Sequence, residues 1–132
     1  MHLTYLALGS NLGDRHKNIQ QAICLIGERV GTVLRQSSLI ETEPWGFDSP
    51  NLFLNGVICC ETELTPRQLL RATQQIERRL GRKKKGGNYA DRLIDIDILL
   101  YDDLTIDEPG LKIPHPLMQQ RDFVMKPLQE II

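Results

Sequence analysis

Two aspartates, Asp95 and Asp97, lie two residues apart inside an apolar run of the chain. In an extended strand successive side chains alternate between two faces, so both carboxylates lie on one face, with Cα atoms about 7 Å apart. The residues expected to enter a core on the opposite face are Ile94, Ile96, Ile98 and Leu100. Two carboxylates this close repel each other unless a cation lies between them, and oxygen ligands that face water suit Mg²⁺. The pair therefore predicts a magnesium site, and the alternative is a strand face that happens to be acidic.

Seven of the sixteen basic residues lie in the stretch that precedes this pair. They are Arg78, Arg79, Arg82, Lys83, Lys84, Lys85 and Arg92. Positive charge beside two carboxylates suits a metal-polyphosphate, in which the metal binds the carboxylates and the remaining phosphate charge contacts the basic groups. Gly86 and Gly87 give this segment the freedom that a lid over the site needs. Taken alone, the basic run equally fits a solvated loop.

The composition fits one globular domain over residues 1–132, because 41% of the residues are hydrophobic and 25% are charged. The net charge of −1 does not indicate a surface that coats nucleic acid. The first apolar run is too short for a signal peptide and no run is long enough to span a membrane, so a cytoplasmic protein is expected. Cys24, Cys59 and Cys60 lie in apolar segments without metal-ligand spacing, which predicts reduced thiols in the core.

The hydrophobic periodicity and the turn residues predict the element order βαββαβ. The predicted strands cover residues 3–8, 32–41, 53–62 and the strand of the aspartate pair, and the predicted helices end at Gly31 and Gly81. The second helix begins at Thr65, with a proline at its first position and Gln68 completing a capping box. This order predicts an α+β fold, a ferredoxin-like sandwich with an antiparallel sheet and two helices on one face. A C-terminal hairpin (101–113) and a short helix are added, and the other sheet face is expected to be free for a site.

One predicted strand carries residues that could bind a flat ligand on that face. Phe53 and Asn55 share a side of the third predicted strand, and an aromatic plane beside an amide suits a heterocycle that needs stacking and edge hydrogen bonds. A core phenylalanine with an asparagine near a turn is an equally open alternative. Trp45 lies in a loop rich in proline and glycine, where a ligand or partner would explain an exposed tryptophan.

Four short motifs occur in order along the chain, at residues 8–13, 92–99, 113–116 and 121–123. They read Leu-Gly-Ser-Asn-Leu-Gly, Arg-Leu-Ile-Asp-Ile-Asp-Ile-Leu, Ile-Pro-His-Pro and Arg-Asp-Phe. With these motifs the chain resembles the 6-hydroxymethyl-7,8-dihydropterin pyrophosphokinases of folate biosynthesis, which move the terminal pyrophosphate of ATP onto a pterin alcohol. The resemblance covers nearly the whole chain and implies the same βαββαβ sandwich, with ATP as co-substrate.

The resemblance also implies roles for individual residues. Asp95 and Asp97 would bind two Mg²⁺ ions, and Arg82 and Arg92 would act on the phosphates during catalysis. The residues implied in ATP binding are Gln74, Glu77, Lys85, Ile98, His115 and Arg121, of which the first two are expected on the exposed side of the second helix. The residues implied in pterin binding are Thr42, Pro44, Trp45, Phe53, Asn55, Tyr89 and Phe123, with the pterin sandwiched between Phe53 and Phe123 and Asn55 reading its edge.

Three positions depart from the usual pattern of that family. Asp91 replaces a proline beside Arg92, Tyr89 replaces a tryptophan of the mobile loop, and Pro116 replaces a tyrosine found in some members. Two other functions remain as alternatives, an RNA-binding module and a regulatory small-ligand domain without catalysis. The low aromatic content of 5% and the acidic pair disfavour RNA. The expected partners are ATP and a pterin alcohol, with no nucleic acid and no membrane, and a monomer is expected.

Overall fold

The computed structural model describes residues 1–44, 49–81 and 93–132. Its strands are β1 (His2–Ser10), β2 (Gly31–Gln36), β3 (Ile40–Thr42), β4 (Phe53–Thr62), β5 (Asp95–Tyr101), β6 (Ile106–Glu108) and β7 (Leu111–Ile113). The main sheet is antiparallel with the order β2-β4-β1-β5, and β3 pairs with β4. β6 and β7 form a hairpin within the range predicted for one, and it is a separate two-stranded sheet. This arrangement confirms the ferredoxin-like sandwich.

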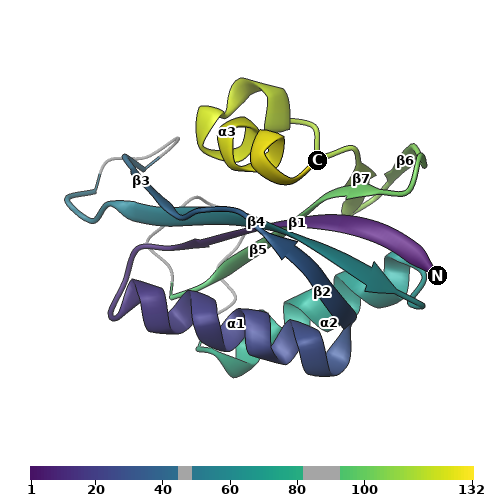
Figure 1. The fold of residues 1–132 in the computed structure, drawn as a ribbon, viewed down its shortest axis with the longest axis horizontal. Helices are drawn as coiled ribbons and strands as arrows, with labels where there is room; N and C mark the ends of the chain where they lie inside the picture. The colour runs from purple at the N-terminus through teal and green to yellow at the C-terminus, as the bar shows by residue number, and fades with distance from the viewer. Residues whose placement is uncertain (45–48, 82–92) are drawn as a thin grey trace.

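Helices α1 (Arg15–Arg29) and α2 (Pro66–Arg79) cover one face of the sheet, as predicted (Figure 1). The Asp14 side chain accepts a hydrogen bond from the Lys17 N–H at the start of α1, and Thr65 and Gln68 form the predicted capping box of α2. Apolar side chains from both helices and from the sheet form a buried cluster between these layers. Of the described helices, none has the length and apolar character needed to cross a membrane.

The single strand predicted over residues 32–41 is divided into β2 and β3. Ser37 causes the break, because its side-chain oxygen takes the place of a backbone carbonyl and accepts the Val57 N–H at 2.8 Å. Gly56 on β4 leaves the space that this connection needs. A Cβ atom on Gly56 would lie 2.5 Å from Cδ2 of Leu39.

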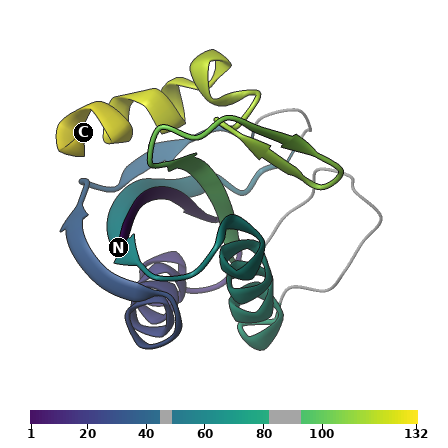
Figure 2. The ribbon, with the colours of Figure 1, turned by 90° about the vertical axis from the view of Figure 1, so that its right-hand side faces the viewer.

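The other face of the sheet is not free over its whole length, contrary to the prediction. Helix α3 (Asp122–Ile131), preceded by the 3₁₀ turn η1 (Met118–Gln120), packs across it (Figure 2). A second buried cluster fills the space between α3 and the sheet. It contains Tyr5, Val57, Cys59, Leu99, Met118, Val124, Leu128 and Ile131. The C-terminal helix therefore completes a third layer and leaves only part of this face for a site.

Hydrogen bonds fix the last turn of α3 to β2 and to the β2–β3 connection. Arg35 donates to the backbone oxygen of Ile131 at 2.9 Å and to the Tyr5 hydroxyl at 3.2 Å. The N–H and the hydroxyl of Ser38 donate to the two carboxylate oxygens of Glu130 at 2.9 and 2.7 Å. These bonds lower the pKa of Glu130. The helix is thus held at both the edge and the centre of the sheet.

A β-bulge in β5 makes the prediction for Leu100 wrong. The pairing with β1 shifts between Tyr5, which pairs with Leu100, and Leu6, which pairs with Ile98. Leu99 is therefore the extra residue. Leu100 consequently packs with the α3-side cluster instead of the helix-side core. The Thr4 hydroxyl donates to the Leu100 carbonyl at 2.7 Å and satisfies this backbone group beside the bulge.

The cysteine prediction is confirmed for two of the three residues. Cys59 and Cys60 are buried free thiols, and burial, with Cys59 beside it, raises the pKa of Cys60 to about 12. A thiol with such a pKa stays protonated and unreactive near neutral pH. Cys24 is also free but lies exposed on α1, so its assignment to the core was wrong.

Candidate functional site

The two aspartates lie on the α3 side of the sheet, at the N-terminal end of β5. Asp95 pairs with Gly9 of β1, and Asp97 pairs with Ala7. Both side chains are half-buried, whereas Ile96 is buried on the opposite face. The predicted alternation of this half of the strand is confirmed. The two carboxylates share one face, as an oxygen-ligand pair requires.

Gly9 lies at the centre of a row that crosses three strands. It pairs with Asp95 on one side and with Asn55 on the other, so these two residues are about 10 Å apart on the same face of the sheet. A Cβ atom on Gly9 would lie 2.9 Å from Oδ1 of Asn55 and 3.5 Å from Cδ1 of Phe53. The missing side chain lets Oδ1 of Asn55 and the Phe53 ring lie close to the β1 backbone. Sequence reasoning missed this role, although a glycine inside an apolar strand is a known signal for close approach.

Three predicted pterin-binding residues meet at the Asn55 end of the row. Asn55 is only 6% exposed, and its Nδ2 donates to the Thr42 hydroxyl at 2.6 Å. Thr42 pairs with Phe53 in the β3–β4 ladder, which places the half-buried Phe53 ring beside both polar groups. Pro44 follows on the same connection and is half-buried. The hydrogen bond fixes which way the Asn55 amide points and leaves its Oδ1 toward Gly9.

His115, Arg121 and Phe123 gather near the Asp95 end of the row. The Arg121 guanidinium carbon lies 5.7 Å from the centre of the Phe123 ring, and the residue is only 8% exposed. Burial and the positive charge of Arg121 lower the pKa of His115, and the negative charge of Asp95 opposes this shift. His115 Nδ1 accepts the Leu117 N–H at 3.2 Å, which places the proton of the neutral ring on Nε2. The site therefore offers an aromatic ring, a cation and an imidazole donor together.

Glu77 does not lie on an exposed side of α2, and that prediction was wrong. The residue is 5% exposed, and its carboxylate accepts the Ile96 N–H at 2.8 Å. β5 is the edge strand of the described sheet, so this N–H points away from β1 toward α2. The carboxylate thus holds the backbone between Asp95 and Asp97. Gln74, one turn earlier, is exposed as predicted.

A cavity of about 270 Å³ lies between α2, β5 and the β6–β7 hairpin. It is lined by Leu70, Ile96, Asp97, Ile98, Gly110, Leu111, Lys112, His115 and Pro116. Two predicted nucleotide-binding residues, Ile98 and His115, therefore lie on its wall, next to one metal-ligand candidate. Sequence reasoning missed Leu70 and Lys112, because α2 and the β6–β7 hairpin come together at this cavity only in the folded chain. Lys112 adds an ammonium group whose position had no signal in the local sequence.

The Gly-Ser-Asn motif connects β1 to the elements around the site. Ser10 is fully buried and accepts a hydrogen bond from Nδ2 of Asn18 on α1 at 3.1 Å. Asn11 Nδ2 donates to the Asn51 carbonyl at 3.2 Å and so ties the end of β1 to the segment that leads into Phe53. The motif thus fixes the positions of the site elements.

Several predicted site residues lie outside the described part of the chain. They are Trp45, Arg82, Lys85, Tyr89 and Arg92. The expected lid and the position of Asp91 also fall there. Within residues 1–44, 49–81 and 93–132, no group of three or more His, Cys, Asp or Glu side chains is placed to hold a metal ion. Asp95 and Asp97 are accordingly a two-residue donor set.

Comparison with known proteins assigns the chain to a family. The family model described as 7,8-dihydro-6-hydroxymethylpterin-pyrophosphokinase (HPPK) matches residues 5–132. The chain belongs to the HPPK family. It is 52% identical over 134 residues to the 2-amino-4-hydroxy-6-hydroxymethyldihydropteridine pyrophosphokinase of Porphyromonas gingivalis, covering 99% of this chain and 91% of the relative. The Bacillus subtilis protein of the same name is 42% identical over 131 residues, covering 98% and 78%.

Solved structures support the fold. An HPPK-DHPS of Plasmodium falciparum superposes with a TM-score of 0.78 at 17% identity, covering 99% of this chain. A second HPPK-DHPS, solved in complex with substrates, gives a TM-score of 0.77 at 14% identity. The chain spans 42% and 40% of these two solved chains. At this identity the likeness shows a shared HPPK-type fold.

Proposed function

We propose that this chain transfers the terminal pyrophosphate of ATP to the hydroxymethyl group of 6-hydroxymethyl-7,8-dihydropterin and releases AMP. The observation that carries the proposal is the row formed by Asp95, Gly9 and Asn55. It sets a carboxylate pair for metal-bound phosphates about 10 Å from an amide and an aromatic ring suited to a pterin. Family membership supports the same reaction. The two alternatives, an RNA-binding module and a non-catalytic domain, gain no support from the comparisons.

The acceptor pterin would lie over the row, between Phe53 at the Asn55 end and Phe123 near the Asp95 end. Phe53 and Phe123 both border the α3 side of the sheet, and they would stack on the two faces of the pterin. Asn55 would pair with the pterin edge through the amide that Thr42 already orients. Gly9 would let the flat ring lie against the sheet. These contacts would aim the hydroxymethyl group toward the carboxylate pair.

Asp95 and Asp97 fit Mg²⁺ as a donor set. Two half-buried carboxylates on one strand face supply hard oxygen ligands, and Mg²⁺ is typically bound by one or two carboxylates together with substrate phosphates and water. We propose that the pair holds two Mg²⁺ ions with ATP, and the ions would neutralise the triphosphate and orient it when bound. Glu77 keeps the backbone between these two ligands in place.

The transfer forms one oxygen–phosphorus bond and breaks another. The hydroxymethyl oxygen attacks the β-phosphorus, the bond from that phosphorus to the oxygen of the α-phosphate breaks, and the hydroxyl proton passes to solvent. A loose transition state needs little proton removal early, so positioning and electrostatics carry most of the rate enhancement. Arg121 and the Nε2–H of His115 would contact the nucleotide. Arg82 and Arg92 would meet the charge that builds on AMP, as the family resemblance implies.

The direct test is the appearance of AMP when the chain is incubated with ATP, Mg²⁺ and the pterin alcohol. Phosphorus NMR should show loss of ATP together with equal amounts of AMP and a pterin diphosphate. Formation of ADP, or loss of ATP without the pterin alcohol, would contradict the proposal. A cytoplasmic location and a monomeric state remain predictions.

A further inference from the structure

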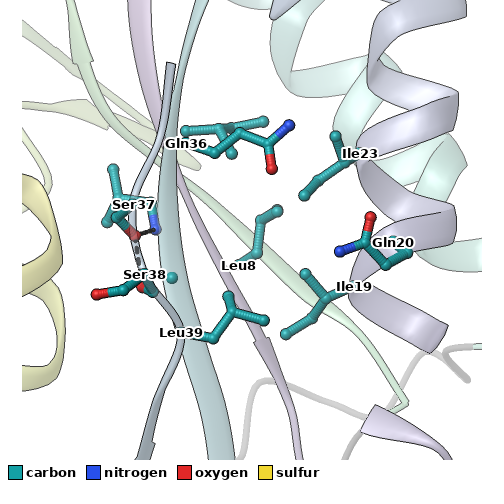
Figure 3. A pocket seen from close by; sticks show the side chains of 11 residues that line it. Leu8, Ile19, Gln20, Ile23, Gln36, Ser37, Ser38 and Leu39 are labelled. Atoms are coloured by element: carbon teal, nitrogen blue, oxygen red, sulfur yellow. Dashed lines mark hydrogen bonds between the residues drawn. The ribbon is translucent and has the colours of Figure 1, made fainter. Parts of the chain in front are cut away.

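A second cavity of about 250 Å³ lies on the sheet face opposite the aspartates, between α1 and the β2–β3 connection (Figure 3). It is lined by Leu8, Ile19, Gln20, Ile23, Gln36, Ser37, Ser38, Leu39, Gly56, Val57 and Ile58. None of these residues was assigned to the pyrophosphokinase site. The break between β2 and β3 opens this cavity, because residues 37–39 leave the regular ladder there.

The lining combines an apolar floor with a polar rim. Leu8, Ile19 and Ile23 supply hydrocarbon surface, while the carboxamides of Gln20 and Gln36 extend into the same space from α1 and from β2 (Figure 3). Within the described part of the chain neither carboxamide makes a hydrogen bond to protein. Both glutamines are exposed, so each has one acceptor and two donor hydrogens that bind water and can be exchanged for a ligand.

The chemistry of the lining selects a class of ligand. No lining residue carries a charge, so an anion or cation would lose hydration without gaining a partner. The volume is slightly below the ~300 to 1,000 Å³ of cavities that hold drug-sized ligands, so a fused two-ring molecule fits and a nucleotide does not. A ring amide, with its N–H and C=O side by side, pairs with a carboxamide through two hydrogen bonds, one in each direction.

We infer that this cavity is a binding site for a small neutral heterocycle with a ring-amide edge, held between Gln20 and Gln36 over the Leu8 and Ile23 surface. The site is separate from the carboxylate row because the sheet lies between them. Its wall is also connected to α3. Ser38, which lines the cavity, donates both its N–H and its hydroxyl to Glu130. An occupant therefore also restrains the connection that anchors the C-terminal helix.

The test uses 2-quinolinone as the probe, with quinoline as a matched molecule that lacks the ring-amide edge. Titration of the full chain is followed by the side-chain NH₂ signals of glutamines in nitrogen-proton NMR spectra. We expect 2-quinolinone to shift the Gln20 and Gln36 signals with a dissociation constant on the order of 1 mM, as for a ligand of this size. Quinoline is expected to bind at least fivefold more weakly.

Two variants and one control decide the site. Gln20→Leu and Gln36→Leu should each weaken 2-quinolinone at least fivefold, while Gln21→Leu, an exposed neighbour on α1 outside the lining, should leave the affinity unchanged. Thermal unfolding of each variant checks that it is folded. Unchanged affinity in both folded cavity variants, or equal binding of quinoline, overturns the inference.

A second titration separates this site from the pyrophosphokinase site. It is repeated with Mg²⁺, a non-hydrolysable ATP analogue and the pterin alcohol present, and the same dissociation constant within twofold is expected. Displacement of 2-quinolinone by the pterin alcohol, with shifts at Asn55 instead of Gln20, would place the probe on the other sheet face and refute the inference. Because neither outcome depends on turnover, the result stands apart from the proposed reaction.

Discussion

Replacement of Gly9 by alanine tests whether the close approach of Asn55 to Gly9 matters for pterin binding. The added Cβ would lie 2.9 Å from Oδ1 of Asn55, where ordinary van der Waals contact begins at 3.4 Å. The Asn55 amide must therefore move by about 0.5 Å, which is the difference between these two distances. Because the surroundings are closely packed, its neighbours must shift with it. The amide is held on its other side by the 2.6 Å hydrogen bond to Thr42, which this shift distorts.

The magnitude follows from the hydrogen bonds at stake. A misplaced Asn55 amide loses about one hydrogen bond to the pterin edge, which contributes about 1 to 1.5 kcal/mol. This corresponds to a roughly tenfold weaker pterin complex. The alanine also reduces the conformational freedom of the unfolded chain, which stabilises the fold by about 0.4 to 1 kcal/mol and offsets part of the strain. We therefore expect a clear loss of pterin affinity in Gly9→Ala with a small change in stability.

Calorimetric titration of the pterin alcohol, with Mg²⁺ and a non-hydrolysable ATP analogue present, measures this loss. Gly27→Ala is the matched control, because Gly27 lies in α1, where an added Cβ has no atom within 4 Å apart from its chain neighbours and the backbone of its own helix. That variant should bind the pterin normally and gain about 0.5 to 1 kcal/mol of stability. Equal pterin affinity in folded Gly9→Ala and wild-type protein would refute the assignment of the pterin to the Gly9 and Asn55 surface.

Four further substitutions test other parts of the structure. Asp95→Ala and Asp97→Ala should each abolish AMP formation while circular dichroism still shows a folded chain, because each removes a metal ligand; near-normal turnover in either contradicts the magnesium assignment. Glu77→Leu should lower the free energy of unfolding by about 2 kcal/mol, since the Ile96 N–H loses a charged acceptor; urea denaturation measures it, and a loss under about 0.5 kcal/mol argues against this bond. Hydrogen bonds from Leu3 and His2 hold the pKa of Asp102 below its ordinary value of 3.8, so the unfolded chain binds more protons there and stability falls as the pH drops below about 4. In Asp102→Asn the midpoint of thermal unfolding should fall less steeply as the pH drops below about 4. An unchanged pH dependence would exclude Asp102 as its source.

Local patterns predicted the element types well. The Thr65 capping box, the apolar face of α2 and the alternation around Asp95 are properties of short segments, and the structure confirms each of them. The family and the reaction followed from motifs in a fixed order, which the comparisons confirm. The individual site roles remain predictions, and part of them concerns residues outside the described ranges.

Three of the errors came from contacts between distant segments. Leu100 changed faces because of a bulge against β1, and strand periodicity contains no signal for such an insertion. Glu77 was expected on the exposed side of the second helix, beside the nucleotide, but its carboxylate accepts a buried N–H from the edge of β5. The C-terminal helix was expected to leave the sheet face free, yet Val124, Leu128 and Ile131 form a stripe that needs an apolar surface.

The bond from Glu77 to the β5 backbone also bears on how the protein behaves at high concentration. An uncovered edge strand can recruit a strand from another molecule, and strands rich in aliphatic residues, as residues 98–100 of β5 are, are prone to this. The carboxylate occupies the Ile96 donor that an incoming strand would need. Together with α2, which covers this edge, the carboxylate therefore protects β5 against intermolecular pairing. A neutral residue at position 77 would therefore first cause aggregation in concentrated solutions, which become turbid while the individual molecules are still folded.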